Sequence, residues 1–396
     1  MKKIILKKGR EKSLLRKHPW VFSGAIQEVI GNPMSGETVE IVDNHDHFLA
    51  RAAYSPSSSI RARVWTFYCD DDVNDEFIYD KLRIAINHRY TYNFLSLDTN
   101  TFRLIHAESD GLPGLVVDQY GDLLVLQILS AGIEFWRSEI IDNLVEITKI
   151  KNIFERSDVE VRKLEGLEQR VGAVHGDKLE TEVEICENGF KFLVDVASGQ
   201  KTGFYIDQRE NRKTIQSYVE NKEVLNCFSY TGAFSVYALA AGAKHVTSIE
   251  SSEDANQLAE RNLEINDLPI GRITLMQSDV FSELRTMRDK ALSYDVIILD
   301  PPKFAPTTAQ VKSAARGYKD INLLAFKLLK PGGKLITFSC SGGVSQNLFQ
   351  KIIADAVLDA GKNAKIIRYL FQGPDHPVAL NFPEGAYLKG LVCQVE

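Results

Sequence analysis

A cysteine and an aspartate follow two apolar runs in the C-terminal half of the chain. Cys340 ends the run KLITFSC and precedes Ser-Gly-Gly, which predicts a position at the end of a strand. Asp300 ends the run YDVIILD, and the two prolines after it restrict the backbone. If these strands are neighbours in one sheet, a thiolate could attack carbon 6 of a pyrimidine while the carboxylate holds the base. Attack at carbon 6 would make carbon 5 nucleophilic enough to accept a methyl group.

The run Asp-Pro-Pro-Lys-Phe supplies further candidates for binding a base. We assign Pro301, Lys303 and Phe304 to the substrate base, because the ring of Phe304 offers a face for stacking. Lys303 and the backbone of 341–343 are candidates for lowering the pKa of the Cys340 thiol. The alternative is that the Asp-Pro-Pro-Lys-Phe run is only a turn that ends the strand, and the residues at the other strand ends make this alternative less favourable.

Three other strand ends carry residues suited to a nucleoside. The first strand, 223–227, leads into a loop with one glycine, Gly232, and then a helix. A pyrophosphate would favour several glycines there, so the loop indicates a ligand without phosphate, such as S-adenosylmethionine. Glu250, eighteen residues further on, could accept hydrogen bonds from ribose hydroxyls. Asp279 with Val280 suits an adenine, although Asp279 could equally cap a helix, and both roles are compatible.

The elements that must position these residues begin near residue 190. From there apolar strands alternate with helical patterns, which predicts a mainly parallel sheet with its site at the carboxyl ends of the strands. Residues 1–70 read as short strands separated by turns, and the segment between them and the parallel sheet combines strands and helices. We therefore predict an all-β domain over 1–72, a small α+β domain over 73–188 and an α/β domain over 189–396.

Composition restricts the function classes. The 396 residues are 44% hydrophobic and 25% charged, and no apolar run approaches the ~20 residues that span a bilayer. The N-terminus lacks the apolar core of a secretion signal, so we expect a cytoplasmic protein with no membrane partner. The five cysteines are scattered and form no CxxC pair, so neither a metal site nor a disulfide framework is predicted.

The net charge of −6 argues against a protein that binds nucleic acid over its whole surface. Residues 1–20, however, hold eight Lys and Arg against one Glu. A local basic patch can dock phosphates, and a solubilising terminus is the equally weighted alternative. The residues that we assign to an RNA backbone are Lys7, Lys8, Arg10, Arg16 and Lys17.

Long motifs give the chain a family resemblance. They are KGREKSLLRKHPWVFSGAI, RLIHAESDGLPGLVVDQYGD, KTGFYIDQRENR, LNCFSYTGAFSVYA, LDPPKF, ARGYKDIN and TFSCSG. The C-terminal half resembles class I methyltransferases. The whole chain resembles the bacterial 23S ribosomal RNA cytosine-C5 methyltransferases that carry an N-terminal PUA domain.

This resemblance implies a PUA domain at about 1–70, a middle β-α-β domain and a Rossmann-like catalytic domain. It implies that S-adenosylmethionine is the cofactor, that 23S rRNA is the substrate and that Cys340 and Asp300 are the catalytic pair forming 5-methylcytosine. The cofactor contacts would be Asp207, Gln208, Arg209, Phe228, Tyr230, Thr231, Gly232, Glu250, Ser251, Asp279 and Val280. Many related enzymes carry a second cysteine after the proline of the Asp-Pro run; this chain has none, and the base for the carbon-5 proton remains unassigned.

Three other readings stay open. A guanine N-methyltransferase of the same fold would need no cysteine nucleophile. A non-catalytic RNA-binding assembly factor would not depend on the cofactor. The single glycine of the first loop argues against a nicotinamide oxidoreductase. The sequence does not decide whether the chain forms a homodimer.

Overall fold

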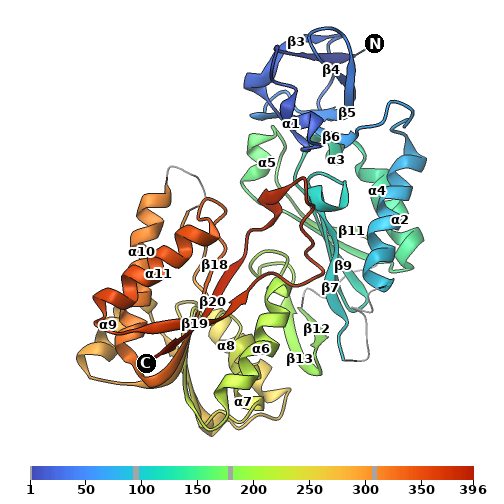
Figure 1. The fold of residues 1–396 in the computed structure, drawn as a ribbon. Helices are drawn as coiled ribbons and strands as arrows, with labels where there is room; N and C mark the ends of the chain where they lie inside the picture. The colour runs from blue at the N-terminus through green and yellow to red at the C-terminus, as the bar shows by residue number, and fades with distance from the viewer. Residues whose placement is uncertain (1, 92–97, 177–181, 306–309) are drawn as a thin grey trace. The chain divides into compact units, whose positions relative to one another are not determined.

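The computed structural model of the chain describes residues 2–91, 98–176, 182–305 and 310–396 (Figure 1). It contains two compact units. The first comprises residues 1–189, 194–206 and 374–385, and the second comprises 190–193, 207–373 and 386–396.

The N-terminal part of the first unit is a six-stranded sheet with the order β2-β6-β5-β4-β1-β3. Alternate residues of its strands are buried, among them Ile4, Ile41 and Ala50, because successive side chains of a strand point to opposite faces. The elements are β1 (Lys3–Leu6), α1 (Lys12–Leu15), β2 (Trp20–Phe22), η1 (Ser23–Ala25), β3 (Ile26–Ile30), β4 (Thr38–Val42), β5 (Phe48–Tyr54) and β6 (Ile60–Thr66).

A five-stranded sheet with the order β11-β10-β9-β8-β7 follows in the same unit. Its elements are α2 (Asp75–Thr91), β7 (Thr101–His106), η2 (Ala107–Asp110), β8 (Leu115–Tyr120), β9 (Leu123–Ile128), α3 (Ala131–Phe135), α4 (Arg137–Thr148), β10 (Asn152–Ser157), α5 (Val161–Leu164) and β11 (Arg170–His175). The α+β prediction for this region agrees with these elements. Gly111 and Gly121 adopt positive φ, 72° and 58°, in the turns of this sheet.

The two sheets of this unit are joined by a buried carboxylate. Glu165 follows α5, accepts a hydrogen bond from Ser55 Oγ at 2.8 Å and pairs with Arg63 at 2.8 Å. It also accepts from the backbone N–H of Ala131. A buried charge is stable only when its partners are in place, so these bonds fix the N-terminal sheet to the adjoining helix.

The second unit is built on a seven-stranded sheet with the order β16-β15-β14-β17-β18-β20-β19. Strands β14 to β18 run parallel, and β20 lies antiparallel between β18 and β19. Helices α6, α7 and α8 pack together, and α9, α10 and α11 form a second group (Figure 1). The α/β class predicted for this region is therefore confirmed.

The elements of the C-terminal half are β12 (Glu182–Glu187), β13 (Phe190–Asp195), η3 (Ile206–Gln208), α6 (Arg209–Val219), β14 (Glu223–Cys227), α7 (Ala233–Ala240), β15 (His245–Glu250), α8 (Glu253–Glu264), η4 (Ile270–Arg272), β16 (Ile273–Gln277), α9 (Val280–Asp289), β17 (Tyr294–Leu299), α10 (Val311–Leu328), β18 (Leu329–Ser339), α11 (Gln346–Asp359), β19 (Ala364–Leu370), η6 (Pro383–Gly385) and β20 (Lys389–Val395).

The strand order reverses on either side of β14, so the switch point lies between β14 and β17. Ligands of open α/β sheets bind at the carboxyl ends of the strands beside such a point. Leu299 of β17 pairs with Thr337 of β18, so the strands that precede Asp300 and Cys340 are neighbours, as the sequence interpretation required.

The domain boundaries at 72 and 188 stay predictions. Residues 194–206 and 374–385 lie within the predicted C-terminal domain and belong to the first compact unit. Hydrophobic periodicity does not reveal which of two folded bodies a segment packs against, so it could not indicate where these two segments belong.

Candidate active site

The loop after β14 has an unusual backbone. Phe228, Tyr230 and Gly232 all adopt positive φ, at 58°, 47° and 78°. For the two non-glycine residues this conformation costs on the order of 1–3 kcal/mol each, and such strain concentrates at functional sites. A Cβ at Gly232 would lie 2.9 Å from Cβ of Ala259, so close packing on α8 also requires glycine here. The tight loop is thus held in one shape.

Glu250, at the end of β15, fixes this loop from the neighbouring strand. Its Oε2 accepts the backbone N–H of Tyr230 at 2.9 Å, and its Oε1 accepts those of Ser251 at 2.8 Å and Ser252 at 3.0 Å. Ser251 is exposed and also donates its hydroxyl to Oε1. Each carboxylate oxygen has two lone pairs, so Oε2 retains capacity for a ribose hydroxyl.

Two buried hydroxyls in the loop suit a polar ligand. Ser229 Oγ and Thr231 Oγ1 are buried and have no hydrogen-bond partner within the part of the chain that the structure describes. Buried polar atoms are nearly always paired, so an unpaired hydroxyl in a strained loop indicates a group that the chain itself does not supply. The main chain is fixed from below, because Asn262 donates to the carbonyl of Thr231 at 3.0 Å.

Asp279, Val280 and Phe281 follow the end of β16. Asp279 caps α9, since its Oδ1 accepts the backbone N–H of Ser282 at 2.9 Å. Val280 is buried, and the half-buried ring of Phe281 lies 6.4 Å from that of Phe228. The capping role that the sequence allowed is therefore confirmed, and the role in binding adenine remains a prediction.

Asp300 is held by the segment before the sheet. Gln208 Nε2 donates to Asp300 Oδ2 at 3.0 Å, and Asn211 Nδ2 donates to Gln208 Oε1 at 2.6 Å. Asn211 also donates to the carbonyl of Phe371. Gln208 and Asn211 are both 2% exposed, so this chain of amides orients the carboxylate from inside the protein. The sequence assigned Gln208 to the cofactor, which stays a prediction, and the structure pairs it with Asp300.

The other two residues of that segment are also buried. Asp207 accepts a hydrogen bond from the Tyr387 hydroxyl at 2.7 Å, and its carbonyl accepts the backbone N–H of Gly373. Arg209 is 3% exposed at the start of α6 and pairs with Glu210 at 3.5 Å. Their assignment to the cofactor stays a prediction.

Cys340 directly follows β18 and is half-buried, outside any disulfide. The next residue, Ser341, fixes its position from two sides. Ser341 Oγ accepts the backbone N–H of Ala305 at 3.1 Å and lies 3.0 Å from the Tyr318 hydroxyl. Burial raises the pKa of Tyr318, so this hydroxyl stays protonated. The loop after β17 and helix α10 therefore both anchor the cysteine.

A lysine that the sequence interpretation did not name completes this group. Lys389, the first residue of β20, is 5% exposed, and its Nζ donates to the carbonyl of Ser341 at 2.8 Å. Burial lowers the pKa of Lys389 to about 8; Cys340 acts in the opposite direction, and Lys303 adds to the lowering. The only available signal was a lysine at the start of the apolar run KGLVCQV.

The residues assigned to the substrate base take different positions. Pro301 is buried and Lys303 is exposed. Phe304 is half-buried, with its ring 4.8 Å from that of Tyr318 and 5.9 Å from that of Phe281. Phe304 thus belongs to an aromatic cluster beneath the strand ends, and its stacking on a base remains a prediction.

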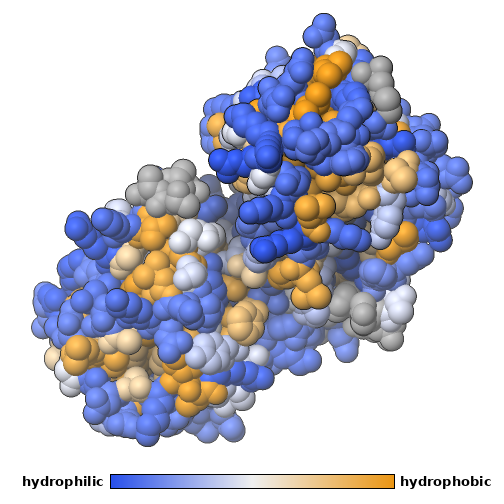
Figure 2. Space-filling view, turned by 45° about the horizontal axis from the view of Figure 1, so that its top comes forward, coloured by the Kyte–Doolittle hydropathy of each residue, from blue (hydrophilic) through white to orange (hydrophobic). Residues whose placement is uncertain are grey.

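The basic residues assigned to RNA lie between β1 and β2 of the N-terminal domain. All five are exposed; Lys7 Nζ donates to the carbonyl of Gly24, and Lys17 Nζ lies 4.9 Å from the centre of the Tyr68 ring. Hydrophilic side chains cover most of the visible surface, with apolar areas between them (Figure 2).

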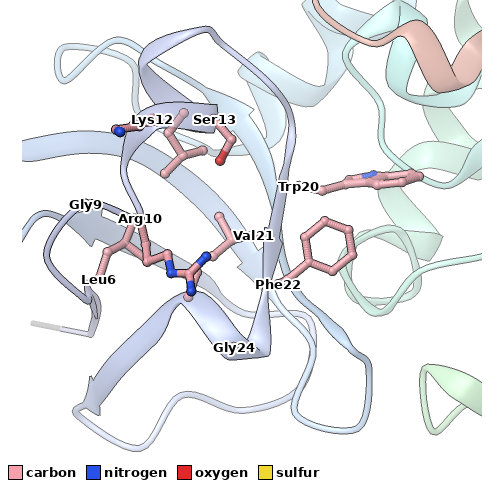
Figure 3. Close-up of a pocket in the computed structure, with 11 residues that line it drawn as sticks. Leu6, Gly9, Arg10, Lys12, Ser13, Trp20, Val21, Phe22 and Gly24 are labelled. Atoms are coloured by element: carbon pink, nitrogen blue, oxygen red, sulfur yellow. The ribbon is translucent and has the colours of Figure 1, made fainter.

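A hollow of about 430 Å³ opens beside this segment, and of the five assigned residues Arg10 lines it. In Figure 3, Arg10 and Lys12 lie on one side of it and the rings of Trp20 and Phe22 on the other. The two rings meet edge to face at 6.2 Å, and Phe22 is 50% exposed. Cationic and aromatic side chains together suit single-stranded nucleic acid.

Residues 2–91, 98–176, 182–305 and 310–396 contain no group of three or more His, Cys, Asp or Glu side chains arranged to hold a metal ion. Within those same ranges, no helix is long and apolar enough to cross a membrane.

Comparison with known proteins defines the two functional regions. Residues 168–360 match the family described as S-adenosylmethionine-dependent methyltransferase, and residues 4–67 match the PUA-like domain. The chain is 53% identical over 391 residues to ribosomal RNA large subunit methyltransferase I of Aeromonas salmonicida, covering 99% of this chain and 98% of that protein. It is 49% identical over 395 residues to the protein of that name from Escherichia coli (strain SMS-3-5 / SECEC), covering 99% of each.

Solved structures share the fold over the full length. A structure of a SAM-dependent methyltransferase from Streptococcus mutans superposes with a TM-score of 0.85 at 23% identity, covering 100% of both chains. A methyltransferase solved in complex with S-adenosylhomocysteine gives 0.87 at 23% identity, again over 100% of both chains. The predicted fold, a PUA-like β domain followed by a class I methyltransferase domain, is confirmed, and so is the predicted cofactor, S-adenosylmethionine.

Proposed function

Because the chain belongs to the ribosomal RNA large subunit methyltransferase I family, we propose that it methylates carbon 5 of a cytosine in 23S rRNA. The observation that carries this proposal is Cys340, fixed after β18 on the strand next to that of Asp300. A methyltransferase acting on an amino group or ring nitrogen has no use for a thiol there.

The cofactor supplies an electrophilic methyl group on its sulfonium. The residues that would hold it surround the strained loop. Glu250 Oε2 would accept a hydrogen bond from the ribose, and the hydroxyls of Ser229 and Thr231 would pair with polar groups. Asp279 would accept from the amine of adenine, with Val280 against the face of the ring.

Cys340 would act as a nucleophile on the base. Its thiolate sulfur would bond to carbon 6 of the cytosine, and the ring electrons displaced by this bond would make carbon 5 nucleophilic. After carbon 5 has gained the methyl group, loss of the carbon-5 proton would return electrons to the ring and break the bond between sulfur and carbon 6. Asp300, oriented by Gln208, would accept a hydrogen bond from the exocyclic amine of the cytosine throughout.

The N-terminal domain would bind the RNA. Its exposed lysines and arginines would neutralise phosphates, and the hollow with Trp20 and Phe22 would receive an unstacked base. The target cytosine must leave its stack to reach Cys340, which costs on the order of a few kcal/mol. An unpaired region of the rRNA would reduce that cost.

Methyl transfer from labelled S-adenosylmethionine to 23S rRNA that lacks the modification tests this proposal. Wild type should form 5-methylcytosine, and Cys340→Ala should form none while binding the cofactor normally. Cys69→Ala is the control, because Cys69 is exposed in the other compact unit. If Cys340→Ala still transfers methyl groups, the acceptor is a nitrogen and the covalent mechanism is wrong. If wild type transfers none, a role as an assembly factor gains support.

A further inference from the structure

Lys389 is a buried cation that reaches the segment after β18. Its strand, β20, runs antiparallel to β18 with Lys389 opposite Ser339, one residue before Cys340. Its Nζ donates to the carbonyl of Ser341, one residue after Cys340. The lysine side chain therefore runs from a position opposite Ser339 to the carbonyl of Ser341, the two residues on either side of Cys340.

We propose that Lys389 takes the proton of the Cys340 thiol and then stays beside the thiolate as an ammonium. The bond between sulfur and hydrogen breaks, the lone pair of Nζ forms a new N–H bond, and the pair keeps its net charge. This inference rests on the proposed function of Cys340 and supplies the activation that the sequence left to Lys303 and backbone amides.

The amine is suited to this exchange in geometry and in proton affinity. The Ser341 carbonyl takes one N–H, which leaves the other hydrogens of an ammonium for the thiolate. Burial brings the pKa of Lys389 to about 8, close to the ~8.5 of an ordinary thiol, so neither partner holds the proton strongly. The mutual attraction of ammonium and thiolate then favours the charged pair.

The other titratable groups near Cys340 are less suited to take its proton and stabilise the thiolate. Lys303, in the loop after β17, is exposed, and its charge opposes protonation of Lys389. Tyr318 of α10 stays protonated because burial raises its pKa. Asp300, the carboxylate on the neighbouring strand, accepts from Gln208 and would oppose a thiolate rather than stabilise it.

The pH dependence of alkylation at Cys340 tests the inference without RNA or cofactor. Full-length protein is treated with iodoacetamide from pH 5 to pH 10, and the peptide that carries Cys340 is quantified by mass spectrometry. Exposed Cys69 is an internal reference in the same sample. In wild type the midpoint for Cys340 should lie below that for Cys69.

Lys389→Met should raise the Cys340 midpoint by at least about one pH unit, which makes alkylation at pH 7 about tenfold slower. Lys389→Arg should keep a lowered midpoint, because a guanidinium stabilises the thiolate by its charge, although the thiol proton then passes to solvent and not to residue 389. Lys362→Met is the matched control: Lys362 Nζ also donates to a backbone carbonyl, that of Leu329 at the other end of β18. It should leave the Cys340 midpoint unchanged.

Two outcomes would overturn the inference. One is an unchanged midpoint in folded Lys389→Met. The other is a wild-type midpoint equal to that of Cys69, a result that needs no variant to fold. Either leaves the methylation proposal standing. Conversely, a midpoint lowered by Lys389 together with full activity in Cys340→Ala would refute the covalent mechanism and not the proton exchange.

Discussion

Replacing Gln208 by Leu tests whether this residue orients Asp300 or binds the cofactor. The variant keeps the bulk of a side chain that is 2% exposed and removes the amide that donates to Asp300 at 3.0 Å. Asn211 keeps its second acceptor, the carbonyl of Phe371, so the segment retains an anchor. A hydrogen bond to a charged group contributes about 1.5–3 kcal/mol. If all of it orients Asp300 in the transition state, kcat falls about 10- to 150-fold.

The assay measures kcat by methyl transfer to RNA and cofactor affinity by calorimetry on the same preparations. We expect kcat to fall with the cofactor Kd unchanged. Gln127→Leu is the control for general destabilisation, because Gln127 is also buried and its Nε2 donates to a backbone carbonyl, that of Arg156. A weakened cofactor Kd with unchanged kcat would refute the reasoning and return Gln208 to the cofactor site that the sequence assigned to it.

Three further predictions concern the cofactor, the RNA and pH. Glu250→Ala should weaken cofactor binding about 10- to 150-fold in calorimetry while RNA affinity is kept, because the ribose acceptor and the anchor of the Tyr230 loop are both lost; an unchanged Kd would limit Glu250 to a structural role. In the double variant Lys7→Ala, Lys8→Ala, RNA affinity should fall less steeply as salt rises. In a filter-binding titration the slope of log affinity against log salt should shrink by roughly 1.4, if each lysine contacts one phosphate of a single strand. An unchanged slope would mean that the RNA binds elsewhere. The pKa of Lys389 is about 8 in the folded chain and ~10.4 in an unfolded one, so between these values the unfolded chain binds more protons and stability rises with pH. In urea unfolding, the free energy of unfolding of wild type should therefore rise by up to about 3 kcal/mol relative to that of Lys389→Met between pH 7 and pH 10.5. A difference that stays constant with pH would mean that water hydrates the Lys389 amine in the folded chain, so that its pKa is not lowered.

Local chemistry made the strand ends readable from the sequence. The first strand of the parallel sheet was predicted at 223–227 and is β14 (Glu223–Cys227). Asp300 and Cys340 were placed directly after their strands because an apolar run followed by Pro-Pro or Ser-Gly-Gly cannot continue as a buried strand. Alternation of strands with helices then required parallel pairing, and with it a common edge for the site.

What the sequence determined by itself were the features set by neighbours along the chain: strand ends, turns, the single glycine of the first loop and the order of the elements. The tertiary structure alone decided which distant groups meet the reactive ones. Gln208 reaches Asp300 across 92 positions, and Lys389 reaches Ser341 across 48. The physical reason is that a sheet brings residues together through strand order and register, and β20 enters antiparallel between β18 and β19 where no local pattern announces it. A buried amide and a buried lysine become readable as parts of a site only once the partners that compensate their burial are in view.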